Sequence, residues 1–477
     1  MTAAKADLAG SSRWVKLLAC AAAMLAIANL QYAWTLFAEP LTKSLNASLA
    51  AVSVAFTLFV IAQTGLFPIV AYLVDRIGPR LVVSVGALLV GAGWIGSGLA
   101  ESLAGLYTAY AIGGLGAGAV YSACVGVAMK WFPDRRGLCV GIVAGSYGFG
   151  TALTNIPISH MIETTGYQSA FITWGAIQGV VVLIAAQFLR MPQPGWVPEG
   201  WETIKAKIQR KVQQSVRDYA PNEMLKTRSF YLLYLMMSLV TFGGLMVTAQ
   251  IAPIAKTYGF DRTIVFTDIT IFGVTIYGAV TALNLTVTLN QVLNGSARPF
   301  FGWISDHAGR YDTMTAVFLL GAISITLMTF LVNNATWFIV ISALTFFAWG
   351  DIYSLFPAAI ADLFGTKHST TNYGIQYTAK GVGSILAGPG AALMMDATGS
   401  WLPVLTAAVL CNVAAAALAA FWLKPLVKRL MSEQAASQAL PQSDALVITD
   451  NLDEVGDDRD SPDDGAGPET AEKVTAD

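Results

Sequence analysis

The chain has 477 residues, of which 55% are hydrophobic and only 12% are charged. A soluble protein carries about 25% charged residues, so this composition argues against a cytosolic enzyme, a nucleic-acid-binding protein and a disordered scaffold. From residue 440 onward the chain holds 12 Asp and Glu against 2 Lys and Arg, whereas the rest holds 26 Lys and Arg against 18 Asp and Glu. These counts indicate a basic membrane body with an acidic tail.

Apolar runs of about 20 residues, the length that a helix needs to cross a bilayer, recur along the chain. Six precede residue 190, at 14–37, 51–74, 81–100, 104–129, 138–158 and 168–189. Six follow residue 228, at 229–254, 270–303, 313–332, 336–362, 371–395 and 401–423. We therefore predict an all-α membrane protein with twelve transmembrane helices, in an N-terminal bundle over 14–189 and a C-terminal bundle over 229–425.

Three segments fall outside these spans, and one stretch that includes the eighth span is too long for a single crossing. Residues 1–13 are predicted to be a cytoplasmic N-terminus, and residues 190–228, with a basic cluster at 205–217, a cytoplasmic linker that holds an interfacial helix. The tail at 426–477 is predicted to be disordered, because it is acidic and poor in aromatic residues. The stretch at 264–303 would be about 60 Å long as a helix, so we expect a broken helix or an external helical extension, with a thirteenth span as the alternative.

The loops set the expected orientation, because cytoplasmic loops carry an excess of Lys and Arg. With the N-terminus inside, the external loops hold only Lys43, Lys256 and Arg262, and nearly all the other cations lie inside. Both termini are therefore predicted to be cytoplasmic in a multi-pass protein of the plasma (inner) membrane.

The two halves of the sequence are related to each other. The sequence DRIGPR at 75–80 follows the second predicted span, and DHAGR at 306–310 follows the eighth. At nearly the same spacing, Tyr121 matches Tyr353, and Tyr147 matches Lys380. Parallel repeats of six helices are typical of transporters whose substrate site lies between the halves at the membrane midplane, so we predict two pseudo-symmetric six-helix bundles.

Longer motifs narrow this prediction. The two DRxGxR-like loops and WFPDRRG at 131–137 resemble the major facilitator superfamily, although Ala71 replaces the usual glycine of the first loop. The segments NLQYAWTLFAEP (29–40), NGSARPFFGWISDHAGRYDTM (294–314), WGDIYSLFPAAIADLFGT (349–366) and NYGIQYTAKG (372–381) are similar to the oxalate/formate antiporter family. The resemblance runs from about residue 14 to 425 and implies the major facilitator fold.

Two cations lie inside predicted spans, where an ionisable side chain is costly and suggests a functional site. Arg298 lies in the eighth span and Lys380 in the eleventh. A guanidinium grips a carboxylate with two parallel hydrogen bonds, and an ammonium adds a compact second charge. We predict an anion site, and the resemblance implies that these residues bind the two carboxylates of oxalate. The alternatives are a structural ion pair for Arg298 and a snorkelling side chain for Lys380.

Aromatic residues accompany the two cations. An aromatic wall would exclude water around a planar anion and strengthen its ion pairs. Ordinary helix packing is the alternative for any one of them. The substrate-binding candidates are Tyr32, Tyr121, Tyr147, Trp349, Tyr353 and Tyr377, the last at a position where we expect tryptophan to be common in the family.

Asp351 departs from the family pattern, in which a small or neutral residue is expected. It could pair with Lys380 or Arg298 in the empty site, or carry a proton that couples monocarboxylate entry to proton entry. It could also face another helix and be satisfied there. If it cancels one cation, the site would favour a monoanion such as formate or lactate.

Charged residues of the predicted cytoplasmic loops are expected to gate the transporter. Their ion pairs would hold the outward-open state and break in the inward-open state. These gating candidates are Asp75, Arg76, Arg80, Arg135, Arg136, Asp306 and Arg310.

The sequence thus predicts a secondary transporter of small carboxylates by alternating access, most simply oxalate:formate exchange. The alternatives are a proton-coupled monocarboxylate transporter and, more remotely, a transporter-like membrane sensor. We expect no enzyme activity, cofactor, metal or nucleic-acid partner, and no ATP, because the chain has no phosphate-binding loop. The expected partners are the carboxylate and the lipid bilayer, and the expected functional unit is a monomer.

Overall fold

The structure is a computed structural model that describes residues 3–193, 195–201, 214–215, 217–271 and 274–439. Contacts divide the chain into two units, 1–431 and 432–477. All of the candidate functional residues lie in the first unit. The predicted boundary between the two bundles and the linker does not coincide with this division, so it stays a prediction.

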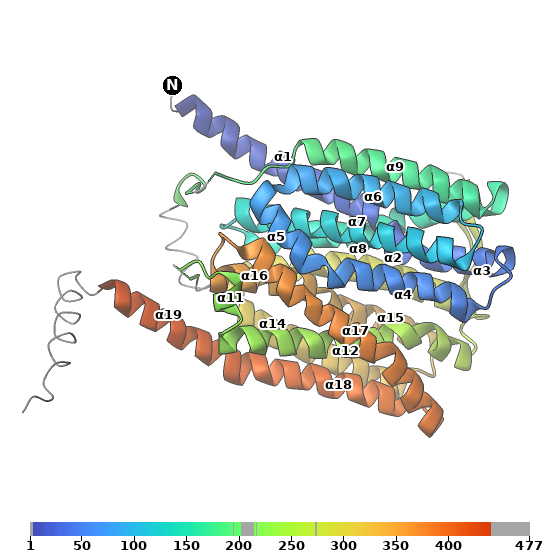
Figure 1. Ribbon diagram of the computed structural model, residues 1–477. Helices are drawn as coiled ribbons and strands as arrows, with labels where there is room; N and C mark the ends of the chain where they lie inside the picture. Colours follow the sequence, from blue (N-terminus) through green and yellow to red (C-terminus); the bar gives the residue numbers. More distant parts are fainter. Residues whose placement is uncertain (1–2, 194, 202–213, 216, 272–273, 440–477) are drawn as a thin grey trace, which may run out of the picture. The chain divides into compact units, whose positions relative to one another are not determined.

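The N-terminal half consists of helices joined by short turns (Figure 1). Its first predicted span is broken at Ala28 and Ala33 into three helices, which leaves a short turn of helix around Tyr32. Its second span bends by 44° between Gly65 and Phe67. The helices are α1 (Ala3–Ile27), α2 (Asn29–Tyr32), α3 (Trp34–Ser44), α4 (Leu49–Gly65), α5 (Phe67–Ile77), α6 (Pro79–Gly98), α7 (Leu103–Trp131), α8 (Arg136–Thr165) and α9 (Tyr167–Gln187).

The C-terminal half has a similar helical series, with a β-hairpin after its first long helix. Its tenth predicted span is interrupted at Asp351, which ends one helix and begins the next. The elements are α11 (Pro221–Met224), α12 (Arg228–Thr257), β1 (Ile264–Ile271), β2 (Val274–Thr281), α13 (Ala282–Ala308), α14 (Arg310–Leu331), α15 (Ala335–Gly350), α16 (Ile352–Phe364), α17 (Ser369–Thr398), α18 (Leu402–Ala417), the π-helix η1 (Leu418–Leu423) and α19 (Lys424–Ala439).

Nine helices of the described residues are long and apolar enough to cross a membrane, and the bent pair of α4 and α5 raises the number to ten. The helices α13 and α17 are outside this set. Each carries polar residues in its middle, including Arg298 in α13 and Lys380 in α17. With these two helices the total would be the predicted twelve, so the exact count stays a prediction.

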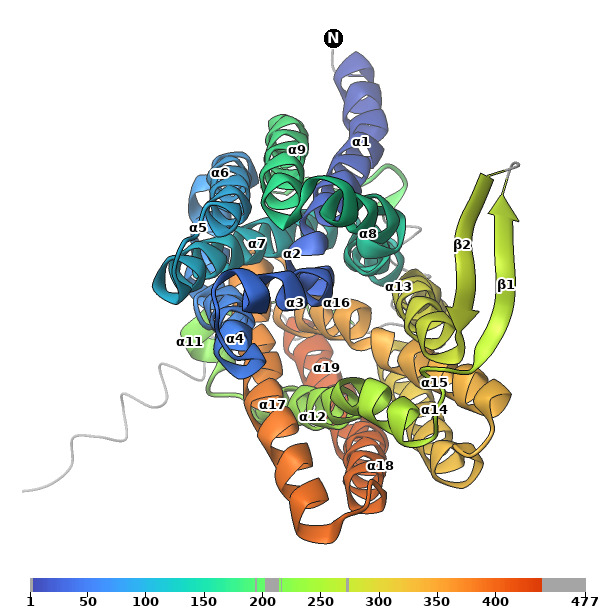
Figure 2. The same ribbon diagram turned by 90° about the vertical axis from the view of Figure 1, so that its right-hand side faces the viewer.

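The segment at 264–281 corrects the expectation of a long or broken eighth helix. It forms an antiparallel hairpin in which β1 pairs with β2, and α13 begins only at Ala282. The strands are rich in Ile, Val and Thr, whose β-branched side chains favour the extended backbone. Figure 2 shows the hairpin standing beside α13. The predicted eighth span, 270–303, therefore starts too early and ends before the helix does, at Ala308.

The halves lie side by side around a central region, with α1–α9 on one side and α12–α18 on the other (Figure 2). Two glycine-rich faces let α8 and α13 approach closely. A Cβ added at Gly141 would clash with the carbonyl oxygen of Arg298, and one added at Gly302 would clash with the backbone of Gly137. These contacts hold the backbone of the N-terminal half directly against the helix that carries Arg298.

Two predicted segments outside the spans are only partly described. The interfacial helix expected around 205–217 lies mostly outside the described residues. The tail is helical as far as Ala439 in α19, so the predicted disorder is wrong for 426–439. Its residues there, which include Leu, Lys, Arg, Met, Glu, Gln and Ala, are good helix formers. Residues 440–477 lie outside the described part.

Candidate functional site

Arg298 is buried in the centre of the bundle, with 1% of its surface exposed. Its Nη1 donates a hydrogen bond of 2.5 Å to the carbonyl oxygen of Ala144 in α8, and its Nη2 donates one of 2.8 Å to Asn294 in its own helix. Its Nε has no partner among the described residues. No carboxylate neutralises this cation in the ion pairs of the described residues, so the structural ion pair considered from the sequence is not found.

Lys380 lies close to Arg298 and is also buried, at 5% exposure. Its Nζ donates a hydrogen bond of 3.0 Å to the hydroxyl of Tyr377, one turn earlier in α17. The ring of Tyr353 joins the two cations. Its centroid is 4.6 Å from the Arg298 guanidinium carbon and 5.6 Å from the Lys380 nitrogen. Both cations therefore lie against the same ring, and the distance between them is at most the sum of these two distances.

The predicted aromatic residues form one connected set around these cations. Tyr32 contacts Tyr147, Tyr147 contacts Tyr121, and Tyr121 contacts Tyr377, each pair with ring centroids 5.4 Å apart. Tyr353 then lies 6.4 Å from Tyr377 and 5.9 Å from Trp349. The chain of rings crosses from α2, α7 and α8 of the N-terminal half to α15, α16 and α17 of the C-terminal half. All eight predicted binding residues are therefore neighbours in space.

Two more aromatic rings complete this wall. Phe67, the first residue of α5, stacks on Tyr377 with a centroid distance of 4.4 Å. Tyr373 lies 5.7 Å from Tyr377. Both are fully buried. The sequence reasoning missed them because a single aromatic residue inside an apolar span gives no signal of its own.

Two glutamines position Tyr147. Gln63 of α4 donates a hydrogen bond of 3.2 Å to the Tyr147 hydroxyl, which donates in turn one of 2.8 Å to Gln31 of α2. This chain links three helices of the N-terminal half at the level of the cations. Neutral amides within apolar helices gave no signal in the sequence, yet they fix the direction of the Tyr147 proton.

Asp351 is fully buried, and neither of its carboxylate oxygens has a partner among the described residues. It does not form an ion pair with Lys380 or Arg298. The structure therefore does not support an ion pair between Asp351 and either cation. The alternative, that a group on another helix satisfies the carboxyl, is not supported either, because both oxygens lack a partner among the described residues.

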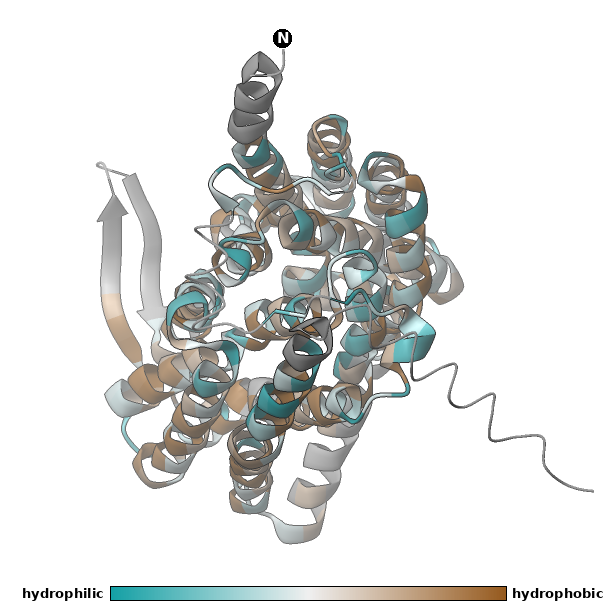
Figure 3. Ribbon diagram, turned by 90° about the vertical axis from the view of Figure 1, so that its left-hand side faces the viewer, coloured by the Kyte–Doolittle hydropathy of each residue, from teal (hydrophilic) through white to brown (hydrophobic). Residues whose placement is uncertain are grey.

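The turns at Gly78 and Gly309 lie at the end of the bundle where α5 meets α6 and α13 meets α14, and we call it the motif end. Figure 3 views this end, where hydrophilic residues gather at the helix termini. Each half's loop aspartate binds a helix N-terminus of the other half. Asp75 accepts hydrogen bonds from the backbone N–H (2.8 Å) and hydroxyl (2.7 Å) of Thr371, near the start of α17. Asp306 accepts from the backbone N–H groups of Gly137 and Leu138 at the start of α8, both at 2.9 Å.

These two contacts are equivalent under the sequence repeat. Carboxylates are stabilised at helix N-termini, where unpaired N–H groups and the helix dipole meet. Asp75 is also paired with Lys130 at 2.7 Å, and Asp306 with Arg310 at 2.5 Å. The motif end therefore carries two crossed capping contacts, each stabilised by a cation of the same half as its aspartate.

Asp362, which the sequence reasoning did not select, is the centre of the motif end. It is buried, at 1% exposure, and forms ion pairs with Arg136 of the N-terminal half and, at 2.8 Å, with Arg310 of its own half. Gln214 donates a further hydrogen bond of 3.1 Å to the same carboxylate. One buried carboxylate thus joins the two halves through two arginines.

Three of the gating candidates lie outside this network. Arg76 is stacked over Tyr72, and Arg80 donates to the side chain of Gln187. Arg135 lies 3.8 Å from Asp134, with 59% of its side chain exposed. All of these contacts are within the N-terminal half, so a gating role of these three arginines stays a prediction.

The close approach of α8 and α13 makes a testable prediction. We expect Gly141→Ala to slow transport by about tenfold or more, because the added methyl would push Arg298 away, and overpacking costs about 1–3 kcal/mol. Uptake into liposomes measures this. Gly65→Ala is the control, because a Cβ there meets no atom within 4 Å. Equal rates for both variants would contradict the proposed importance of this contact.

The chain is similar to known proteins in both sequence and structure. The profile of the Major Facilitator Superfamily matches residues 19–283 and 262–448. The oxalate:formate antiporter of Oxalobacter formigenes is 35% identical over 379 residues, which is 79% of this chain and 84% of that protein. Monocarboxylate transporter 14 of Mus musculus is 22% identical over 431 residues, covering 75% of this chain and 78% of that protein.

Solved structures agree on the fold. The Major Facilitator Superfamily transporter FucP in the outward conformation aligns with a TM-score of 0.61 at 13% identity, over 86% of this chain and 99% of that chain. The proton:xylose symporter XylE aligns with a TM-score of 0.64 at 14% identity, over 87% of this chain and 96% of that chain. At these identities the likeness establishes the architecture alone.

Proposed function

Because this chain belongs to the Major Facilitator Superfamily and is a multi-pass membrane transporter, we propose that it exchanges small carboxylates, with oxalate and formate as its substrates. One observation carries the proposal. Arg298 and Lys380, from two different helices, are buried beside the same Tyr353 ring without a carboxylate partner. Such an arrangement is expensive in an empty membrane protein and suits an anion with two carboxylates.

The binding geometry follows from the hydrogen bonds already made. The Nε of Arg298 is available to one substrate carboxylate, and Lys380 provides the charge for the other after leaving Tyr377. Hydrogen bonds between ionised groups are about twice as strong as neutral ones. The aromatic wall excludes water and lowers the local dielectric, which strengthens both ion pairs.

This charge arrangement accounts for exchange. In the empty site two cations repel each other, and closing the halves around them removes the last water that shields them. A bound carboxylate supplies the missing negative charge, so the loaded carrier closes more readily than the empty one. The carrier then returns only with a second anion bound, which couples the entry of one carboxylate to the exit of another.

We also assign the described conformation. Apart from the bond of Arg298 to Ala144 in the centre, the side-chain hydrogen bonds given above between the halves lie at the motif end, which we place in the cytoplasm with both termini. The protein is then closed to the cytoplasm. Opening toward the cytoplasm breaks the contacts of Asp75, Asp306 and Asp362 together.

Proteoliposomes test the proposal. We expect labelled oxalate to enter liposomes loaded with oxalate or formate, to stay out of liposomes loaded with buffer alone, and to be insensitive to an imposed pH gradient. Absence of oxalate uptake under every loading condition would overturn the proposed substrate. Uptake without internal anion would overturn obligate exchange.

Asp351 favours a second candidate, proton-coupled monocarboxylate transport. Its carboxyl is fully buried with both oxygens unpartnered among the described residues. Burying an ionised carboxylate without a partner is very unfavourable, so this side chain suits a site that carries a proton while the carrier is in this state. The match to a monocarboxylate transporter is compatible with that chemistry.

The variant Asp351→Asn separates the two candidates. If transport is exchange, we expect the variant to keep at least half of the oxalate exchange rate, because the amide is the same size and remains neutral. If transport is coupled to protons, the variant should lose the stimulation of formate or lactate uptake by external acid, by about tenfold or more. Both rates are measured in the same liposomes, with and without a pH gradient.

A further inference from the structure

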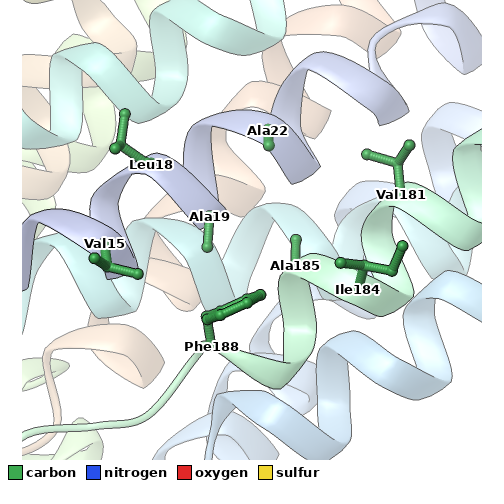
Figure 4. A pocket seen from close by; sticks show the side chains of 8 residues that line it. All are labelled: Val15, Leu18, Ala19, Ala22, Val181, Ile184, Ala185 and Phe188. Atoms are coloured by element: carbon green, nitrogen blue, oxygen red, sulfur yellow. The ribbon is translucent and has the colours of Figure 1, made fainter. Parts of the chain in front are cut away.

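An apolar groove runs between α1 and α9 on the side of the N-terminal half, away from the carboxylate site. It has a volume of about 360 Å³. Figure 4 shows its eight lining side chains, four from α1, three from α9 and that of Phe188, which follows α9 directly. They are Val15, Leu18, Ala19, Ala22, Val181, Ile184, Ala185 and Phe188.

The groove is on a membrane-facing surface. Leu18 is 69% exposed, Ile184 58% and Phe188 53%, and both helices are apolar enough to span a bilayer. Small residues at Ala19, Ala22 and Ala185 leave the hollow between the larger side chains. Within the hydrocarbon layer such a hollow accepts an acyl chain, because the lipid tails are as apolar as its walls.

Two cationic residues, Lys16 and Arg190, lie at the end of the groove that is nearest the motif end. Figure 4 shows Val15 and Phe188 together at one end of the groove, and Lys16 and Arg190 follow in the sequence. Trp131 contacts both residues: its ring centroid lies 4.2 Å from the Lys16 nitrogen, and its Nε1 donates a hydrogen bond of 2.6 Å to the backbone carbonyl oxygen of Arg190.

Neighbouring charges leave this end basic. Arg80 approaches α9 from the side and bonds to Gln187, the last residue of the helix. Asp134 is paired at 2.9 Å with Arg13, three residues before Lys16 in α1. Arg190 is exposed to the surface of the bundle. Basic pockets between transmembrane helices at the membrane surface are typical binding sites of anionic lipid headgroups.

We propose that the groove and the cations at its end bind one anionic phospholipid, with an acyl chain between α1 and α9 and the phosphate near Lys16 and Arg190. The apolar walls of the groove match the acyl chain of such a lipid, and the two cations match its phosphate. This site is independent of the carboxylate site and does not require the proposed exchange activity.

The experiment uses the full-length protein reconstituted in vesicles of phosphatidylcholine with one fifth phosphatidylglycerol, followed by extraction and native mass spectrometry. We expect Arg190→Gln to lower the phosphatidylglycerol that stays bound by about fivefold, and Ala185→Trp, which fills the groove, to lower it similarly. Because Arg190 is exposed, its substitution leaves the helix packing intact.

Two controls make the result specific. Lys43→Gln removes an exposed cation, 75% accessible, that is paired with Glu39. Leu153→Trp enlarges a membrane-facing residue, 69% exposed, outside the groove. Both should retain as much phosphatidylglycerol as the original protein. The proposal would be overturned if Arg190→Gln retained as much phosphatidylglycerol as the original protein, or if either control lost as much as Arg190→Gln. If Arg190→Gln lost the lipid and Ala185→Trp did not, the groove would not be the site of the acyl chain.

Discussion

Lys380→Ala is expected to abolish oxalate exchange while leaving the protein folded and more resistant to heat. Removing a charged hydrogen-bond partner from a buried ion pair costs about 2–5 kcal/mol of binding, and about 3 kcal/mol is more than a hundredfold in affinity. The same substitution removes a buried cation that repels Arg298 in the empty site. A charge in the middle of a membrane helix costs about 2.5–3.5 kcal/mol on insertion scales, so the thermal midpoint of the empty protein should rise.

Arg298→Lys tests the geometry separately from the charge. The lysine keeps the positive charge, but it cannot make the two parallel hydrogen bonds of a guanidinium. It would also lose the contacts to Ala144 and Asn294. We expect weaker oxalate binding with formate binding less affected, because formate has only one carboxylate to share between the two cations.

The control for both variants is Lys256→Ala, an exposed cation at the end of α12. Binding is measured by competition against labelled oxalate, and stability by thermal unfolding of the purified protein without substrate. A Lys380→Ala protein that exchanges oxalate at the original rate would contradict the assigned site. A lower thermal midpoint with lost exchange would mean that Lys380 stabilises the fold instead of binding the substrate.

The chemistry of the candidate site was largely predictable from the sequence, because its strongest signals are local. A cation within an apolar run stands out without any structural knowledge, and the repeat aligned Tyr147 with Lys380. The network of the motif end was less accessible. Arg136 and Asp362 are 226 residues apart, and no periodicity in one sequence links such residues. Asp362 lies at the end of a predicted span, where a charged residue is common and does not indicate a functional site.

The hairpin at 264–281 shows the limit of reading apolar runs. An apolar segment is compatible with a helix or a strand, and only its β-branched content separates them. The same holds for Gln31 and Gln63, whose role depends on the position of Tyr147 in another helix. Composition predicts where the chain is buried. The partner of a neutral polar group depends on how the helices are arranged.

Asp362→Asn is expected to open the motif end. The asparagine is nearly the same size but leaves Arg136 and Arg310 buried without their shared carboxylate. Breaking a buried ion pair by removing one partner costs about 3–5 kcal/mol. Since only the closed motif end buries both arginines against this residue, most of that cost falls on one conformation. A difference of about 3 kcal/mol changes the ratio of the two conformations by about 150-fold.

Spin labels at positions 76 and 307, one on each half at the motif end and both exposed, report this opening as a longer distance between them. The matched control is Asp312→Asn, which breaks the Lys424 pair of the same end but within one half and with both side chains more than 50% exposed. Exposed pairs contribute about 0–1 kcal/mol, so its distance distribution should not change. An unchanged distribution in Asp362→Asn would mean that the crossed contacts of Asp75 and Asp306 suffice to keep the motif end closed.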